Sequence, residues 1–570
     1  MTHKIYKILG TALICMAGYA CQDNAWDDHY AAPGDGTSDK TLLQLCEENP
    51  ELSKFTAIVR ENGLDKLLAS SQTFTIFAPT NAAMEAFELT SDTLSQFLNN
   101  HICRYTYTLG DVLDAEEQLL RIKMLNEKYQ NLENVDGALL FGNYGKVLET
   151  QGAGNGVLNV IDNIIPFYRN IYEEIQNGER TDSIAKYLGS MDEYTFNATA
   201  STIIGVNENG ETVYGDSVME YSNPWMKVYG DIYKEDSVYT MLIPSNDAWI
   251  AQYDKLKEYY RTFGVGTTKV SGIKVTGEFE IGSPLADSLT DVHTREAIVQ
   301  DLVFRKSVDV EAPDGDSLVS TADHVFHAPQ YLFAGAEKRD VSNGQMYVTD
   351  ELKFKASESW QNEIRVEAEN SSNYATQYCG SVSSRSVEEF PQFSGMVSDN
   401  KFLLVTPSNL SFQKNTVRFA LPNTLAGTYN IYIVTLPASA VDTTNAANPD
   451  KMLSTKLNFY LTYVHEDGTL KEDAAIKTES DFGGGQTATP TDSDKPAFET
   501  DAYNVKKMLV ASNFRFPYAN YTASPFSPTT EEKITTSYLR VECIVTSSAD
   551  LKKYEKNLRI DCIILEPVNE

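Results

Sequence analysis

The stretch Phe74–Met84 reads FTIFAPTNAAM and decides the fold, because a related stretch, YTMLIPSNDAW, occupies Tyr239–Trp249. The offset between the two copies is 239 − 74 = 165 residues. Each copy is an apolar, β-prone run followed by proline, a hydroxyl residue and asparagine. This order predicts a buried strand that ends at proline, and then a helix capped by the hydroxyl or the amide. We expect these helices over Ala82–Phe87 and Asp247–Tyr260.

A second motif also occurs twice. The segment Asn155–Asp162 reads NGVLNVID, and Asn343–Asp350 reads NGQMYVTD. Here the offset is 343 − 155 = 188, so the second copy carries 188 − 165 = 23 extra residues between its motifs. Asn-Gly before an alternating run is typical of a tight turn that leads into a strand. Between the motifs, Phe97–Arg104 aligns with Ile298–Arg305, and both predict a helix that runs into a strand.

These three elements, in this order, resemble the fasciclin domain. That family carries a TIFAPTN-type element, a central helix-to-strand element containing histidine, and a final NG-to-VID strand. The resemblance implies two α+β domains, at residues 41–175 and 181–355, in which twisted strands pack beside several helices. The second copy departs from the pattern, since Leu302 stands where the first copy has His101. Residues 208–236 and 265–290 of this copy are interpreted as insertions.

The resemblance implies adhesion or extracellular recognition, and no chemical reaction. We interpret Asn81 and Asn246 as caps or turn formers, with direct ligand contact as the alternative. His101 is interpreted as a hydrogen-bonded, half-buried histidine rather than a catalytic or metal-binding one.

From residue 356 the pattern changes to short alternating apolar runs separated by Gly, Pro, Asn and Ser clusters. Such a pattern over residues 356–570 predicts an all-β sandwich or jelly roll. The whole chain is therefore predicted to be an α+β multidomain protein, two fasciclin-like domains followed by an all-β jelly-roll sandwich. The expected strands are Ile364–Ala368, Lys401–Val405, Thr416–Leu421, Tyr429–Leu436, Lys456–Val464, Lys506–Ala511, Ser537–Thr546 and Leu558–Leu565.

Three segments of this region resemble galactose-binding-like jelly rolls, a group that includes many carbohydrate-binding modules. They are the EAEN opening at Glu367–Asn370, the AGTYNIYI strand at Ala426–Ile433 and the IDCIILEP ending at Ile560–Pro567. In that group the first and last strands are neighbours, and their acidic residues often hold a structural Ca²⁺.

The resemblance thus implies a Ca²⁺ site formed by Glu367, Glu369 and Asp561, whereas the alternative is that these are solvent-facing strand carboxylates. Sugar-binding surfaces need exposed aromatic side chains. Four tyrosines in predicted loops are candidates for that contact: Tyr374, Tyr378, Tyr518 and Tyr521.

The N-terminus has the features of an exported lipoprotein. A basic start and an apolar run of about 13 residues end in AGYAC, which predicts a signal peptide over residues 1–21. The motif resembles the bacterial lipobox with Cys21 as the acylated (palmitate-bearing) residue, while Cys15 and a plain secretory signal are the alternatives. The acidic stretch that opens the tether, residues 22–40, resembles the surface-export signal of Bacteroidota lipoproteins. We therefore expect a protein anchored in the outer membrane and exposed at the cell surface.

The formal net charge of −33 argues against nucleic acid or an anionic membrane as a partner. Five cysteines remain beyond the signal region, and this odd, sparse set is not a disulfide framework. Either they are free buried thiols, or one pair (Cys543–Cys562 or Cys46–Cys103) forms a bridge and leaves Cys379 and the others free.

No nucleophile elbow, Walker loop, zincin helix or Cys-x-x-Cys motif is present in the sequence, so we expect no enzymatic activity. The pair His324 and His327 has a metal-ligand spacing, but the short segment around it does not favour a helix. Our leading hypothesis is a surface-exposed binding or adhesion lipoprotein that accompanies a TonB-dependent channel and captures a glycan or peptide. The alternatives are a structural scaffold or adhesin subunit of an outer-membrane complex, and a cryptic glycan hydrolase.

Overall fold

A computed structural model describes residues 39–85, 91–207, 209–264, 266–271, 273–305, 317–410, 412–483, 486, 494–520 and 537–568. The predicted signal peptide, the acylated Cys21, most of the tether and Tyr521 lie outside these residues. Two compact units make up the chain. The first holds residues up to 173 together with 233–237 and 340–343, and the second holds the remainder. Within the described residues, no helix is long and apolar enough to span a membrane.

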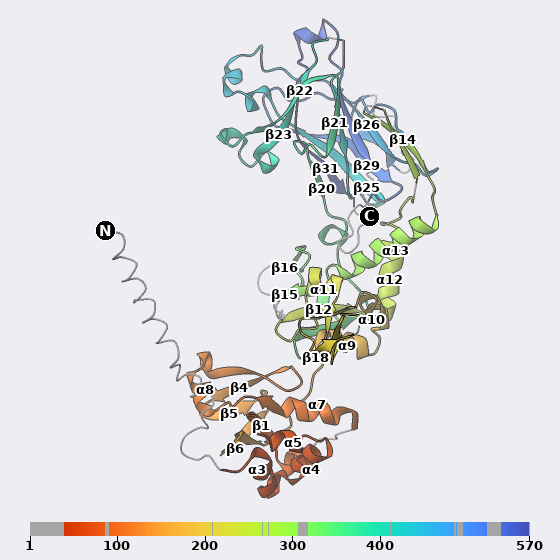
Figure 1. The fold of residues 1–570 in the computed structure, drawn as a ribbon. Helices are drawn as coiled ribbons and strands as arrows, with labels where there is room; N and C mark the ends of the chain where they lie inside the picture. Colours follow the sequence, from red (N-terminus) through yellow and green to blue (C-terminus); the bar gives the residue numbers. More distant parts are fainter. Residues whose placement is uncertain are drawn as a thin grey trace, which may run out of the picture. The chain divides into compact units, whose positions relative to one another are not determined.

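The first unit is built on a seven-stranded sheet in the order β2-β1-β7-β6-β5-β4-β3, with helices beside it (Figure 1). The neighbouring strands β1 and β7 are parallel, and the other neighbours are antiparallel. The strands are β1 (Phe74–Pro79), β2 (Ile102–Arg104), β3 (Leu119–Lys123), β4 (Tyr129–Val135), β5 (Ala138–Phe141), β6 (Gly145–Ala153) and β7 (Gly156–Ile161). The helices are α3 (Leu42–Glu48), α4 (Ser53–Glu61), α5 (Asp65–Leu68), α6 (Asn81–Glu85), α7 (Ser91–His101) and α8 (Leu109–Asp114).

All six residues of β1 and all six of β7 are buried, as expected for parallel strands covered on both faces. The helix after β1 begins at Asn81, one residue before the predicted start, because the Thr80 hydroxyl accepts a hydrogen bond from the Ala83 N–H. The predicted helix residues Ala86 and Phe87 lie outside the described part of the chain.

The second repeat keeps the central strands of this design. Its sheet has the order β15-β12-β19-β18, and β12 runs parallel to β19. The strands are β12 (Tyr239–Pro244), β15 (Val303–Arg305), β18 (Glu337–Val341) and β19 (Gly344–Thr349), with a separate hairpin of β16 (Ser317–Val319) and β17 (Val325–His327). The helices are α9 (Ile171–Asn177), α10 (Asp182–Gly189), α11 (Pro224–Tyr229), α12 (Asn246–Leu256), α13 (Pro284–Val299) and α14 (Gln330–Phe333).

The register of the parallel pair confirms the internal repeat. Phe74 pairs with Gly156 in the first sheet, and Tyr239 pairs with Gly344 in the second. Both glycines have positive φ, +142° and +148°. A Cβ added at either position would lie 1.9 Å from the carbonyl oxygen of its strand partner. The Asn-Gly motif therefore marks a place where only glycine lets the two backbones approach.

The insertions of the second repeat form two features. The first lies at residues 193–222 rather than at the predicted 208–236, and it carries two β-hairpins, β8 (Glu193–Phe196) with β11 (Met219–Ser222) and β9 (Ile203–Val206) with β10 (Thr212–Tyr214). The later insertion forms the hairpin of β13 (Gly266–Ser271) and β14 (Lys274–Phe279). Although this hairpin lies within the sequence range of the second repeat, β14 pairs with β27 of the C-terminal region.

The C-terminal region contains two large sheets (Figure 1). One has the order β13-β14-β27-β26-β30-β24-β21, and the other β22-β23-β31-β25-β29-β28 with β20 paired to β31. Residues of both sheets form one apolar core, which includes Phe419 and Phe459 from the first and Ile433 and Phe514 from the second. The strands are β20 (Ile364–Glu367), β21 (Tyr374–Gln377), β22 (Cys379–Ser386), β23 (Lys401–Pro407), β24 (Thr416–Ala420), β25 (Gly427–Thr435), β26 (Leu457–Val464), β27 (Thr469–Glu472), β28 (Ser480–Asp481), β29 (Lys506–Phe516), β30 (Tyr538–Cys543) and β31 (Leu558–Pro567).

All eight predicted strands of this region form, and β20 is the antiparallel neighbour of β31 as the resemblance implied. The sequence did not predict β21, β22, β27 and β28. Of these, β22 has five exposed and three half-buried residues, so it lacks the apolar alternation that identifies a strand in sequence.

Candidate functional site

The polar residues singled out in the repeats are structural. The Asn81 carboxamide accepts a hydrogen bond from the Lys54 N–H at 2.9 Å and donates to the Pro50 carbonyl at 2.8 Å. The Asn246 carboxamide accepts from the Ser183 N–H at 2.9 Å. Of the two predicted caps for the helix after each strand, the hydroxyl or the amide, the structure has the hydroxyl, that of Thr80 or Ser245. Each asparagine instead joins its own helix to the first turn of an earlier helix, Asn81 to α4 and Asn246 to α10.

His101 is fully buried rather than half-buried, and both ring nitrogens have backbone partners. Nδ1 lies 2.8 Å from the Phe97 carbonyl, and Nε2 accepts from the Ile165 N–H at 3.1 Å. Burial lowers the pKa of His101 to about 4, so the ring is neutral near pH 7. The interpretation of His101 as a hydrogen-bonded histidine is confirmed.

The histidines at 324 and 327 have separate partners. His324 Nδ1 lies 2.9 Å from Oδ1 of the buried Asp301, whereas the exposed His327 faces Glu358. Burial alone would lower the pKa of His324, but the hydrogen bond and charge of Asp301 outweigh it and raise the pKa. Over the described residues, no group of three or more His, Cys, Asp or Glu side chains is arranged to hold a metal ion.

The predicted calcium ligands lie at the β20–β31 edge. Glu367 pairs with Cys562 across the two strands, and the Ser398 loop contacts both strands. The Ser398 hydroxyl donates to Glu367 Oε1 at 2.6 Å, and its N–H donates to Asp561 Oδ1 at 3.0 Å. The structure thus brings Glu367 and Asp561 to one loop, although the side chains of the predicted set do not converge as metal ligands.

The pKa values of these carboxylates are shifted by burial and by their mutual repulsion. Burial, followed by the charges of Glu367 and Glu369, raises the pKa of Asp561 to about 7. Burial also raises the pKa of Glu369, with a further contribution from Glu367. Glu367 Oε2 and Glu369 Oε2 are buried without a hydrogen-bond partner. Two carboxylate oxygens therefore lack hydrogen bonds next to Asp561, whose charged form is disfavoured. A hard cation such as Ca²⁺ would bind oxygens of this kind.

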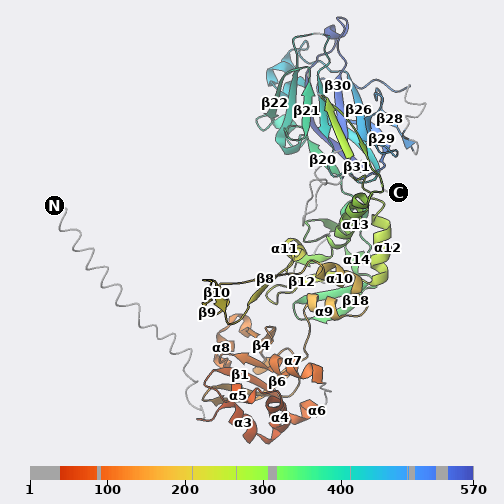
Figure 2. The ribbon, with the colours of Figure 1, turned by 45° about the vertical axis from the view of Figure 1, so that its right-hand side comes forward.

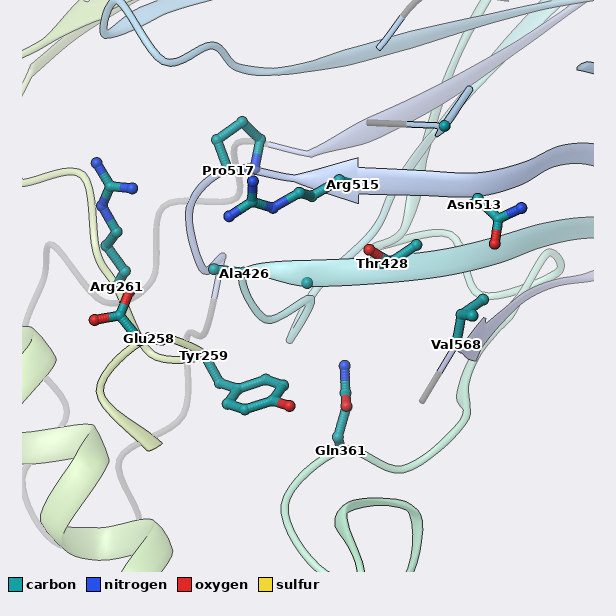
Figure 3. A pocket seen from close by; sticks show the side chains of 12 residues that line it. Glu258, Tyr259, Arg261, Gln361, Ala426, Thr428, Asn513, Arg515, Pro517 and Val568 are labelled. Carbon is teal, nitrogen blue, oxygen red and sulfur yellow. The ribbon is translucent and has the colours of Figure 1, made fainter. Parts of the chain in front are cut away.

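A cavity of about 620 Å³ lies in the second unit, where the turn after α12 meets the C-terminal sheets (Figure 3). Backbone bonds fix that turn, since the Ala426 N–H donates to the Tyr259 carbonyl at 2.8 Å and the Ala519 N–H to the Arg261 carbonyl at 2.7 Å. The described residues that line the cavity are Glu258, Tyr259, Arg261, Gln361, Ala426, Gly427, Thr428, Gly483, Asn513, Arg515, Pro517 and Val568.

The strand side of the cavity is shaped by an irregularity in β29. Asn513 has a φ of +52°, and the pairing with β25 shifts register at this point. After this bulge Arg515 is paired with Thr428 on β25. Figure 3 shows Arg515 extending toward the side where Arg261 lies, with Tyr259 and Gln361 pointing toward one another below Thr428.

The charges in the cavity are unusual for so acidic a chain. Two arginines, Arg261 and Arg515, line it with one carboxylate, Glu258. The Arg261 guanidinium is held by the Tyr518 ring, whose centroid lies 4.6 Å away, and by Glu466 at 3.8 Å. The Arg515 side chain is exposed, and it makes no hydrogen bond or ion pair with the described residues. An exposed arginine that has no partner in the described part of the chain is available for an anionic ligand.

The sequence identified few of the residues at or near this cavity. Among the predicted aromatic contacts, Tyr518 is buried and positions Arg261, while Tyr374 packs against Phe419 and Tyr378 is exposed. The five cysteines of the described residues are free, which agrees with the expectation of buried thiols for all except the half-buried Cys379. Neither arginine was predicted, because the cavity arises from segments more than 250 residues apart in the sequence.

Comparisons with solved structures give weak overall likenesses. A FAS1 domain pair from the insect cell adhesion molecule Fasciclin I is 13% identical, with 55% of this chain and 99% of that chain covered at a TM-score of 0.20. The CBM22-1 xylan-binding domain of Paenibacillus barcinonensis Xyn10C is 10% identical and covers 36% of this chain and 94% of its own, also at 0.20.

A family 11 carbohydrate-binding module from Clostridium thermocellum, solved with a mixed-linked tetrasaccharide, is 12% identical, with coverage of 36% and 97% and a TM-score of 0.20. At these TM-scores the likenesses bear no weight for the site. No curated protein matches the chain. The sequence profile of the Fasciclin domain matches residues 50–166, so this part of the chain, from the residues before α4 to those after β7, is a Fasciclin domain.

Proposed function

We propose that this protein is a cell-surface binding protein that captures a carboxylate-bearing glycan or peptide in the cavity lined by Arg261 and Arg515. One observation carries the proposal. In a chain of net charge −33, the described residues that line the 620 Å³ cavity include two arginines and a single carboxylate. Such a cavity would be selective for anionic ligands, because the acidic surface elsewhere repels them and the two arginines attract them. The Fasciclin domain at residues 50–166 supports a binding or adhesion role.

The lining suits a polar ligand. Arginine presents a planar fork that matches a carboxylate with two parallel hydrogen bonds. Gln361, Asn513 and Thr428 add amide and hydroxyl groups, which pair with sugar hydroxyls or a peptide backbone. Tyr259 supplies an aromatic ring. Cavities of this size at a junction between structural regions are common ligand sites.

Binding without catalysis fits the same residues. Glycoside hydrolysis usually needs two carboxyl groups that flank the scissile bond. Glu258 is the one carboxylate among the described residues that line the cavity. We therefore propose ligand capture as the role of this cavity.

The location, the partner and the metal site that we propose are those predicted from the sequence. In our proposal, Cys21 carries the lipid anchor in the outer membrane and a TonB-dependent channel takes up the captured nutrient. We also propose that a structural Ca²⁺ would draw Glu367, Glu369 and Asp561 together at the β20–β31 edge, since their side chains are not grouped as ligands among the described residues. Their two unpaired carboxylate oxygens support this part of the proposal. The ion would neutralise the crowded acids and tie the first strand of the region to the last.

The experiment is a binding screen of the purified chain against acidic and neutral glycans and peptides, with and without Ca²⁺. We expect binding to a carboxylate-bearing ligand, and we expect Arg515→Ala to weaken it about 10- to 100-fold. Arg385→Ala is the matched control, because Arg385 is also an exposed arginine of the C-terminal sheets and lies on β22. Absence of binding in every arm would contradict the proposal, as would equal loss in both variants.

A further inference from the structure

The hairpin insertion of the second repeat exposes an unusual number of apolar side chains. We define the arm as residues 193–222, in which β8 pairs only with β11 and β9 only with β10 within the described chain. All residues of β8 and of β9 are exposed. The apolar residues with at least 38% exposure are Tyr194, Phe196, Ile203, Ile204, Val206, Val218 and Met219.

The arm is nevertheless an ordered element. The Tyr221 hydroxyl donates to Asp192 at 2.8 Å, and Asn223 donates to the same carboxylate at 2.9 Å, which holds the base of the arm. Further out, the Thr202 N–H donates to Asp216 at 2.7 Å, and the rings of Phe196 and Tyr214 meet at 4.8 Å. Figure 2 shows β9 and β10 standing apart from helices α9 to α14 of the same unit, with β8 leading toward them.

A hairpin that contacted only water would not be expected to expose so many apolar side chains. Two-stranded hairpins are marginally stable in water, and contiguous exposed apolar side chains usually mark an interaction site. Ile203 and Ile204 are adjacent on β9 and point to opposite faces, yet they are 62% and 66% exposed. Each strand of a two-stranded ladder also has one edge with unpaired N–H and C=O groups. The arm therefore offers apolar contacts and backbone partners together.

Charge restricts the occupant. The arm sequence, residues 193–222, contains five Asp and Glu and no Lys or Arg. This excess of negative charge opposes an anionic lipid surface, and it opposes a second copy of the same acidic chain. It favours a partner with positive charge beside its apolar residues.

We propose that the arm is a docking surface for an extended protein segment that alternates apolar side chains with lysine or arginine. Such a segment adds a strand to the free edge of the β9–β10 ladder, the common mode of β-augmentation. Its apolar side chains cover Ile203, Ile204 and Val206, and its cations face Glu211 and Asp216. This surface is distinct from the arginine-lined cavity and does not depend on the ligand proposed there.

The test uses a fluorescent octapeptide of alternating valine and lysine, titrated with the full chain, and its valine–glutamate analogue. We expect the lysine peptide to bind at least tenfold more tightly than the glutamate peptide, with weaker binding at high salt. The variant I203S/I204S/V206S should lose at least tenfold, and Ile204→Lys alone should also weaken binding. The control M396S/L410S/F412S removes equally exposed apolar side chains from the C-terminal region and should bind normally.

A circular dichroism spectrum equal to that of the parent chain confirms that each variant is folded. The proposal is overturned if the arm variants bind as well as the control, if both peptides bind equally, or if neither binds at millimolar concentration. It is also overturned if the same arm residues mediate binding to anionic vesicles or self-association in sedimentation.

Discussion

The guanidinium of Arg261 stacks on the ring of Tyr518, with 4.6 Å from its central carbon to the ring centroid, and donates a 3.2 Å hydrogen bond to the tyrosine hydroxyl. Arg261 follows α12, whereas Tyr518 follows β29, so this contact joins the second repeat to the C-terminal sheets. It sets the direction of a cavity arginine by contacts that are independent of any ligand. Such preorganisation lowers the entropy cost of binding.

We predict that Tyr518→Phe weakens ligand binding about threefold to tenfold while the free energy of unfolding changes by about 1 kcal/mol or less. The ring remains to fill its buried site, but the guanidinium loses its hydroxyl acceptor. Tyr460→Phe is the control, since it also removes a hydroxyl with a polar partner, Glu542, from the C-terminal region. Equal affinity of both variants for the ligand would show that the Tyr518 hydroxyl does not position Arg261.

For Asp561 we predict an effect of pH on stability. Its pKa is raised from 3.8 to about 7 in the folded chain, so the folded state binds more protons than the unfolded state between these values. The stability that this proton provides is present below pH 4 and is lost as the pH rises through 7.

In EGTA at pH 8, the free energy of unfolding of Asp561→Asn should therefore exceed that of the parent by about 2–4 kcal/mol, as measured by denaturant unfolding. The amide keeps an oxygen for the Ser398 N–H. Ca²⁺ should raise the melting temperature of the parent chain but not of Asp561→Asn, and Glu388→Gln, an exposed carboxylate, should behave as the parent. No response to Ca²⁺ at pH 8 would exclude the calcium site.

His101 should make the first domain sensitive to acid. Because burial lowers its pKa from 6.5 to about 4, the unfolded chain binds more protons between these values. The contribution of the neutral ring, about 3 kcal/mol, is present above pH 6.5 and is lost as the pH falls to 4. His101→Leu should reduce the slope of stability against pH in this window, whereas the exposed His327→Leu should leave it unchanged. Urea unfolding at several pH values measures both.

The buried Lys128 of the first unit should be important for stability. Its ammonium lies 2.8 Å from Glu173 and 2.6 Å from Glu235, and its side chain is 5% exposed. Lys128→Met leaves two carboxylates without their cation and should cost about 3–5 kcal/mol. Adding Glu235→Gln should recover part of this loss. Lys54→Met, which removes an exposed ion pair with Glu85, should cost no more than about 1 kcal/mol in the same denaturation experiment.

The repeat itself predicts a strong effect of glycine substitution. Gly156→Ala places a methyl group 1.9 Å from the Phe74 carbonyl oxygen at a φ of +142°. The strands must separate, so we expect a loss of more than about 3 kcal/mol or failure to fold. Gly205→Ala has open space around its Cβ and should change stability by about 0.5 kcal/mol at most. Comparable losses in the two variants would contradict the proposed role of the Asn-Gly motif.

The sequence predicted the elements that local pattern determines. The strands Phe74–Pro79 and Tyr239–Pro244 are identified by apolar runs that end at proline, and their register follows from the glycines at 156 and 344. The sequence did not predict that β14 joins the C-terminal sheet through Gly277 and Glu278. Pairing between distant segments depends on tertiary packing, which periodicity does not report.

The same limit applies to the candidate site. Glu367 and Asp561 were identified because the motifs that carry them open and close one region. Arg261 and Arg515 carry no motif, and their position depends on the bulge at Asn513 and on the turn after α12. A β-bulge made by an asparagine with positive φ has no reliable signature in a single sequence.

The most direct test of the central claim is a calorimetric titration of the purified chain with an acidic oligosaccharide and with its carboxyl-reduced form. The two ligands differ only at the carboxylate. We predict that the acidic form binds about 10- to 100-fold more tightly, the equivalent of one or two charge-assisted hydrogen bonds, and that Arg515→Ala removes this difference. Equal affinities for the two forms, or a difference that persists in Arg515→Ala, would contradict the assignment of the cavity as an anion-selective binding site.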